Sequence, residues 1–167
     1  MLKALSIFLQ KIIPMKVNKF TLTDPIQFLA LGFGSGLAPK APGTFGTIAA
    51  IPLLMLCASL TVTQYSVLIV LMSLIGIYLC GYAAKAAGVH DHPAIVWDEF
   101  VGLFITMFMI PLTWQTMIVG FILFRLFDIV KPWPISWLDK HCHGGFGIMI
   151  DDIVAGLAAL ACMHLIF

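Results

Sequence analysis

The stretch Ile95-Val96-Trp97-Asp98-Glu99-Phe100-Val101-Gly102 places two adjacent carboxylates at the start of a long apolar segment. That segment runs from residue 100 to residue 124 without a charged side chain. Burying a carboxylate against apolar surface is costly unless a cation or hydrogen bonds compensate for the lost hydration. The stretch therefore predicts that a positive group lies beside Asp98 and Glu99.

The same argument extends to other acids of the chain. The sequence has only eight acidic residues, and five of them lie at the edges of apolar segments within 55 positions of one another. These five are Asp98, Glu99, Asp128, Asp151 and Asp152. Their spacing predicts that they share one site.

Composition indicates a membrane protein of one domain. The 167 residues are 61% hydrophobic and 10% charged, whereas soluble domains are about 25% charged. Residues 41–84 contain no Asp, Glu, Lys or Arg, so they cannot coat a surface that faces water. The alternative is a soluble helical protein with an unusually apolar core. The net charge of +1 gives no indication of nucleic-acid binding.

Apolar runs separated by Gly, Pro and polar residues predict an all-α fold, namely a polytopic membrane bundle of about four to five hydrophobic helices. The expected helices cover residues 25–30, 48–60, 64–87, 94–110, 114–130 and 148–167. Residues 1–20 hold four lysines among apolar residues and are predicted to form a basic amphipathic segment on the membrane surface. Residues 21–167 would form the membrane domain.

Helix lengths predict where the five acids meet. The helices over 94–110 and 114–130 would each be about 25 Å long, which is the short end of a membrane crossing. A hairpin at Pro111 brings their open ends to the same side, where the last helix also starts. All nine Lys and Arg residues flank this rim, including the four lysines of the N-terminal segment. The turns at 61–63 and 111–113 are uncharged. The positive-inside rule therefore predicts an active site at a cytoplasmic rim.

The residue types at the rim point to phosphoryl chemistry on a lipid headgroup. Carboxylate oxygens suit Mg²⁺ or Mn²⁺, so all five acids are candidate metal ligands and catalytic groups. Basic side chains could hold an anion beside the metal, and a Gly-Thr loop that opens a helix could bind phosphate oxygens. The candidate substrate-binding residues of these two kinds are Lys40, Arg125, Lys131, Gly43, Thr44 and Thr47.

Three other interpretations fit the same residues. Arg125 and Asp128 are three positions apart and could form a plain helix salt bridge. The acids could favour helix N-termini through the helix dipole, as in a non-catalytic assembly factor. They could also serve as ion sites in a small ion-coupled membrane transporter, which would place them near the middle of the bilayer.

Six motifs, taken in order, resemble those of the bacterial phosphatidylglycerophosphatase A family. They are FGSGL (33–37), APGT (41–44), GVHDH (88–92), IVWDE (95–99), FRLFD with KPWPI (124–128 and 131–135) and HGGFGIMIDDIVAG (143–156). The resemblance spans nearly the whole chain from about residue 24 onward.

This resemblance implies a Mg²⁺-dependent, multi-pass phosphatase of the bacterial inner (plasma) membrane. It would convert phosphatidylglycerophosphate to phosphatidylglycerol and phosphate on the cytoplasmic side, a step of phospholipid biosynthesis. His143, which opens the last motif, is added to the candidate substrate-binding residues. Whether an aspartate or a water attacks phosphorus is left open by these residues.

Overall fold

The computed structural model describes residues 20–89 and 91–167, and every regular element in these ranges is a helix. The all-α prediction is confirmed for this part of the chain. The predicted N-terminal segment lies outside the described residues except for Phe20. The elements are α2 (Pro25–Ala30), the 3-10 helix η1 (Ser35–Leu37), α3 (Pro42–Leu56), α4 (Val62–Ala87), α5 (Trp97–Thr106), α6 (Trp114–Val130), α7 (Ile135–His141) and α8 (Gly144–Ile166).

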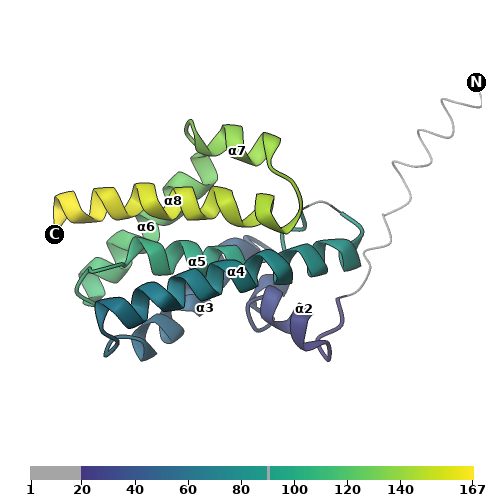
Figure 1. Cartoon of the computed structure of the whole chain (residues 1–167), viewed down its shortest axis with the longest axis horizontal. Coiled ribbons are helices and arrows are strands. Elements are labelled where there is room, and N and C mark those ends of the chain that lie inside the picture. The colour runs from purple at the N-terminus through teal and green to yellow at the C-terminus, as the bar shows by residue number, and fades with distance from the viewer. Residues whose placement is uncertain (1–19, 90) are drawn as a thin grey trace, which may run out of the picture.

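Helix α5 forms the centre of the bundle and contacts α3, α4, α6 and α8 (Figure 1). Each of its ten residues except Asp98 is buried. A helix that is apolar on all sides must be covered on all sides, and Phe100, Leu103 and Phe104 fill the core around this one. The apolar segment that follows the two adjacent carboxylates is therefore the axis of the fold.

This central helix is shorter than the sequence predicts. The prediction of a helix over residues 94–110 is wrong at both ends, because α5 begins at Trp97 and ends at Thr106. Met109 has a left-handed φ of 59°, and the chain cannot continue as a helix into Pro111. At 1.5 Å per residue α5 is about 15 Å long, so it cannot cross a bilayer by itself.

Other helices begin earlier than predicted. Helix α3 starts at Pro42 instead of residue 48, and α8 starts at Gly144 instead of residue 148. The loop predicted over 135–147 contains α7. Proline and glycine are tolerated there because the first-turn amides of a helix have no partner within the helix.

Two helices are long and apolar enough to cross a membrane. Helices α4 and α8 have 26 and 23 residues, which correspond to about 39 and 35 Å. The outer face of α4 exposes large apolar side chains, among them Val67, Leu71 and Leu74. Soluble proteins rarely gather such side chains in one patch, so this surface supports membrane association.

Glycines set the short distance between α5 and α8. A Cβ added to Gly156 would lie 2.6 Å from the carbonyl oxygen of Gly102, and a Cβ added to Gly102 would overlap the ring of Phe124. The Thr106 hydroxyl donates to the Gly102 carbonyl at 2.8 Å and lies 3.4 Å from the Gly156 carbonyl. Small residues allow this close backbone approach between membrane helices.

The glycine contact predicts a sharp effect on stability. Gly156→Leu should lower the free energy of unfolding by about 3 kcal/mol, because the new side chain has no space against α5. Ala161→Leu on the exposed side of the same helix is the matched control and should behave like the wild type. Thermal unfolding of both variants in detergent measures the difference. Equal midpoints would show that the close approach does not limit packing.

Candidate active site

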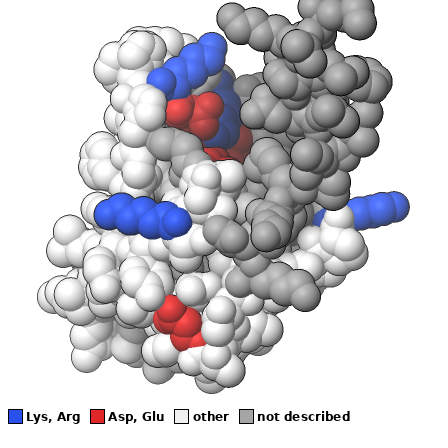
Figure 2. All heavy atoms as spheres, turned by 90° about the vertical axis from the view of Figure 1, so that its right-hand side faces the viewer, with Lys and Arg blue, Asp and Glu red and all other residues white. Residues whose placement is uncertain are grey.

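A hollow of about 260 Å³ lies at the end of the bundle where α3, α5 and α8 begin and α6 ends. Figure 2 looks at this end and shows acidic and basic side chains gathered in a hollow. The lining residues are Ala41, Pro42, Gly43, Asp91, Pro93, Ile95, Asp98, Glu99, Arg125, Asp128, Lys131, Ile148, Asp151 and Asp152. All five acids that the sequence singles out are therefore brought together.

Three of these acids approach one another most closely. One carboxylate oxygen from each of Asp98, Glu99 and Asp152 lies within 4.8 Å of the other two. One oxygen of each of these carboxylates, namely Oδ1 of Asp98, Oε2 of Glu99 and Oδ2 of Asp152, is buried without a hydrogen-bond partner. Three carboxylates cannot stay charged together in such a place without a counter-charge. The set has the donor chemistry that Mg²⁺ or Mn²⁺ requires.

Burial also changes the acidity of the two carboxylates at the start of α5. It raises the pKa of Glu99 to about 8, and the neighbouring Asp152 carboxylate adds to the effect. Burial and the Glu99 charge raise the pKa of Asp98 well above its usual range. A bound divalent cation would reverse both shifts, because it favours the ionised form.

Arg125 is the cation nearest to the three acids. Its Nη1 lies 2.6 Å from Oδ2 of Asp128 and 3.7 Å from Oε1 of Glu99. The i, i+3 ion pair within α6 therefore exists, but the same guanidinium also faces α5. Neither Nε nor Nη1 makes a hydrogen bond of good geometry, and both are buried. An anion that accepts from this guanidinium would satisfy it.

Gly43 is the residue of α3 that lies against Glu99 and Arg125. A Cβ added there would overlap Oε1 of Glu99 and would lie 3.0 Å from Nη1 of Arg125. Only a residue without a side chain leaves this side of the hollow open. Gly43 thus lies where the sequence placed it, at the helix start beside the candidate anion site.

Lys131 differs from Arg125 because two carboxylates on two other helices pair closely with it. Its Nζ lies 2.6 Å from Asp139 on α7 and 2.5 Å from Asp151 on α8. Burial acts to lower the pKa of Lys131, but these two ion pairs outweigh it and the net effect raises the pKa. Lys131 therefore holds Asp151 in place and links α6, α7 and α8.

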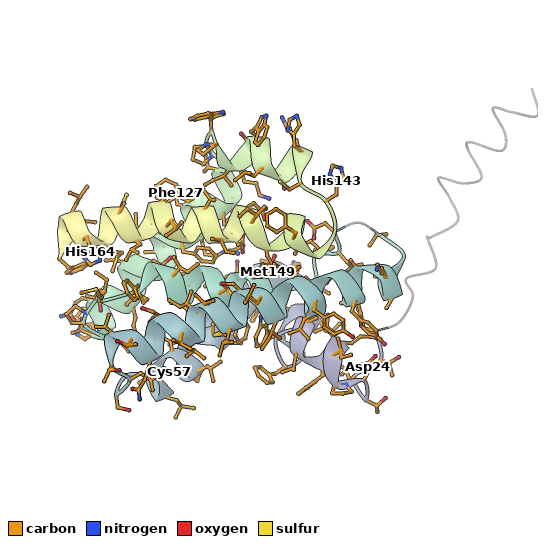
Figure 3. All side chains as sticks on the ribbon, in the orientation of Figure 1. Asp24, Cys57, Phe127, His143, Met149 and His164 are labelled. Atoms are coloured by element: carbon orange, nitrogen blue, oxygen red, sulfur yellow. The ribbon has the colours of Figure 1, made fainter. Side chains whose placement is uncertain are left out.

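Four predicted substrate-binding residues do not line the hollow. Lys40 is exposed, and Thr44 sits in the first turn of α3, where its amide donates to Ala41. Thr47 is fully buried and its hydroxyl donates to the Gly43 carbonyl at 2.8 Å. His143 lies outside the bundle on the loop before α8 (Figure 3), with Nδ1 3.0 Å from the His141 carbonyl. The expected phosphate-binding loop is helical instead, which turns both threonines away.

Asp91 lines the hollow but is absent from the five acids chosen from the sequence. It lies in the loop between α4 and α5, not at the edge of an apolar segment, and its side chain is exposed. The sequence could have indicated Asp91 through the position of its loop, because the predicted order of the helices places this loop at the same rim as the five acids.

Comparison with known proteins identifies the family. The family described as phosphatidylglycerophosphatase A matches residues 28–167. The chain belongs to this family. The match includes every residue of the hollow described above, from Ala41 to Asp152.

Two curated members of the family are similar over most of their length. The phosphatidylglycerophosphatase A of Escherichia coli K12 is 49% identical over 150 residues, which cover 89% of this chain and 87% of the relative. That of Haemophilus influenzae Rd is 48% identical over 146 residues, covering 86% and 90%. A putative phosphatidylinositol-3-phosphatase of Bacteroides thetaiotaomicron is 37% identical over 139 residues, covering 77% and 85%. No solved structure matches the chain.

The geometry of the acids predicts cation binding by the protein alone. Titration of purified protein with Mn²⁺, followed by electron paramagnetic resonance, should show binding that Asp152→Asn weakens at least about 100-fold, since even partners of metal ligands contribute 10- to 100-fold. Asp24→Asn is the control, because Asp24 caps α2 and asparagine caps equally well. Unchanged affinity in Asp152→Asn would exclude this residue as a ligand.

Proposed function

We propose that the protein hydrolyses phosphatidylglycerophosphate to phosphatidylglycerol and phosphate. The observation that carries the proposal is the identity of nearly half the residues to two phosphatidylglycerophosphatases over almost the whole chain. The hollow adds chemical support, because it combines a carboxylate cluster with a guanidinium that lacks good hydrogen bonds. Both are features of sites that act on phosphate esters.

Asp98, Glu99 and Asp152 are the residues that would hold Mg²⁺, since their oxygens converge and lack partners. When bound, the ion supplies positive charge for the phosphoryl oxygens and an acidified water. Arg125 would hold a phosphate oxygen on the side of the hollow where Gly43 of α3 lies, with Asp128 fixing its orientation through the 2.6 Å ion pair. Asp151, fixed by Lys131, leaves its Oδ1 free to accept a proton.

In this reaction an oxygen nucleophile forms a bond to phosphorus while the bond from phosphorus to the glycerol oxygen breaks. The leaving glycerol oxygen takes up a proton and remains with the lipid as the hydroxyl of phosphatidylglycerol. Positioning and charge neutralisation carry most of the catalysis in such displacements. The hollow provides both within one end of the bundle.

We further infer a multi-pass arrangement with the hollow at the cytoplasmic side of a bacterial inner membrane. Helices α3, α4, α6 and α8 would cross or nearly cross, and α5 would lie inside their ring. Lys40, Lys85 and Lys140 lie near the hollow end in this arrangement, and the turns at 57–61 and 107–113 carry no charge. The positive-inside rule supports that orientation. The gathering of the acids at one end gives no support to a transporter with ion sites at mid-membrane.

The proposal predicts metal-dependent phosphate release. Purified protein should release phosphate from phosphatidylglycerophosphate in micelles, EDTA should abolish this release, and Mg²⁺ should restore it. Asp98→Asn should lower kcat by about 10³-fold, because it removes charge from the cation site. Asp24→Asn should retain wild-type activity. Full activity of Asp98→Asn, or release that survives EDTA, would contradict the assigned site.

Orientation is tested separately by thiol labelling. In a variant that lacks the four native cysteines, Thr63→Cys and Lys140→Cys each place one thiol on an exposed position at opposite ends of the bundle. In spheroplasts a membrane-impermeant maleimide should label Thr63→Cys at once and Lys140→Cys only after the membrane is permeabilised. Labelling of Lys140→Cys in intact spheroplasts would reverse the orientation.

A further inference from the structure

A separate apolar groove lies on the outside of the bundle, along two of the helices that also line the hollow. It is a groove of about 470 Å³ between α3 and α6, and apolar side chains of these two helices form its whole lining. Several of them, including Ile48, Ile118 and Ile122, are about half exposed. The groove belongs to no part of the site described above, and none of the described residues fills it.

The groove points at the site because α3 and α6 run antiparallel. At one end Gly43 of α3 meets Arg125 of α6. Ile51 of α3 and Met117 of α6, each eight residues from these two along its helix, both line the groove. The same two helices therefore present a guanidinium at one end of the seam and only hydrocarbon along the rest.

The groove begins about one helical turn from Arg125 and follows α6 away from the hollow. Its lining on α6 runs from Ile122 to Trp114, eight residue steps that correspond to about 12 Å. Ile122 is three residues from Arg125, or about 5 Å along the helix axis. The acyl chain of a lipid whose headgroup lies at the level of Arg125 would therefore reach the groove.

Another large cavity does not share this connection. It measures about 530 Å³ and lies beside the C-terminal part of α4, lined by Tyr78, Tyr82 and Lys85 among others. Between it and the hollow, α4 and α8 are in backbone contact, since a Cβ on Gly145 would overlap the carbonyl of Ile77. The seam between α4 and α8 is thus closed, whereas α3 and α6 make few direct contacts with each other.

We propose that the groove between α3 and α6 binds one acyl chain of the lipid substrate and so holds the phosphate ester beside Arg125. This inference rests on the proposed function and adds a binding site for the apolar part of the substrate. Binding energy from a part of the substrate that does not react helps to position the reacting group. The groove would therefore make the enzyme favour long-chain over short-chain phosphatidylglycerophosphate.

The test compares two substrates with the same headgroup. One carries two four-carbon acyl chains and is soluble, and the other carries two sixteen-carbon chains and is presented in detergent micelles. Ile118→Trp and Ile122→Trp fill the groove with a larger side chain, and Leu74→Trp on the exposed face of α4 is the matched control. The measured quantity is the ratio of kcat/KM for the long-chain substrate to kcat/KM for the short-chain substrate.

In both groove variants this ratio should fall at least about ten-fold, because each methylene that loses its burial contributes about a factor of four and the loss of two is enough. Activity on the short-chain substrate should stay at the wild-type level, which also shows that the variants fold. A ratio that is unchanged in the groove variants, or that falls equally in Leu74→Trp, would overturn the acyl site and leave the phosphatase assignment standing. Failure of the wild type to hydrolyse either substrate would overturn the proposed function itself.

Discussion

The structure depends on one constraint, which is the burial of several carboxylates at the end of an apolar bundle. Oxygens of Asp98, Glu99 and Asp152 lie close together and several of them lack hydrogen bonds. Without a positive partner such a cluster would give up its charge or open to water. One feature of the fold lowers the free-energy cost of this burial. Asp98 and Glu99 lie in the first turn of α5, where the positive end of the helix dipole favours negative charge.

The glycine contact between α5 and α8 links this electrostatic requirement to the packing. Gly102 and Gly156 meet where the two helices come closest, and both helices run away from the hollow. Asp98 and Asp152 each lie four residues, or about one turn, before these glycines and therefore on the same faces. The contact that packs the core also brings the two carboxylates together. Changes in helix spacing would act directly on the distance between the candidate metal ligands.

The two cations at the hollow have different surroundings and so suit different tasks. Lys131 is held by Asp139 and Asp151, which makes it a connection between three helices. Arg125 has one close acid and donors that lack good hydrogen bonds, and it lies beside a glycine that keeps the space in front of it open. A planar guanidinium whose Nε makes no hydrogen bond is well suited to bind a phosphate group. The groove between α3 and α6 begins at Ile122, about one turn from Arg125, so a headgroup and an apolar chain could be bound along the same two helices.

The sequence by itself determined the helical class, the apolar character of the surface and the gathering of five acids at one end. These follow from the period and length of the apolar runs and from the few charges, which are local properties of the chain. Tertiary structure decided that residues 97–106 form a short buried axis, because only the surrounding helices make such burial possible. It also decided that α3 begins at Pro42, which turns Thr44 and Thr47 away from the hollow, and that Lys131 is occupied by Asp139 and Asp151. Sequence spacing cannot show which side of a helix faces which neighbour, and it is that choice which separates a residue of the site from a residue beside it.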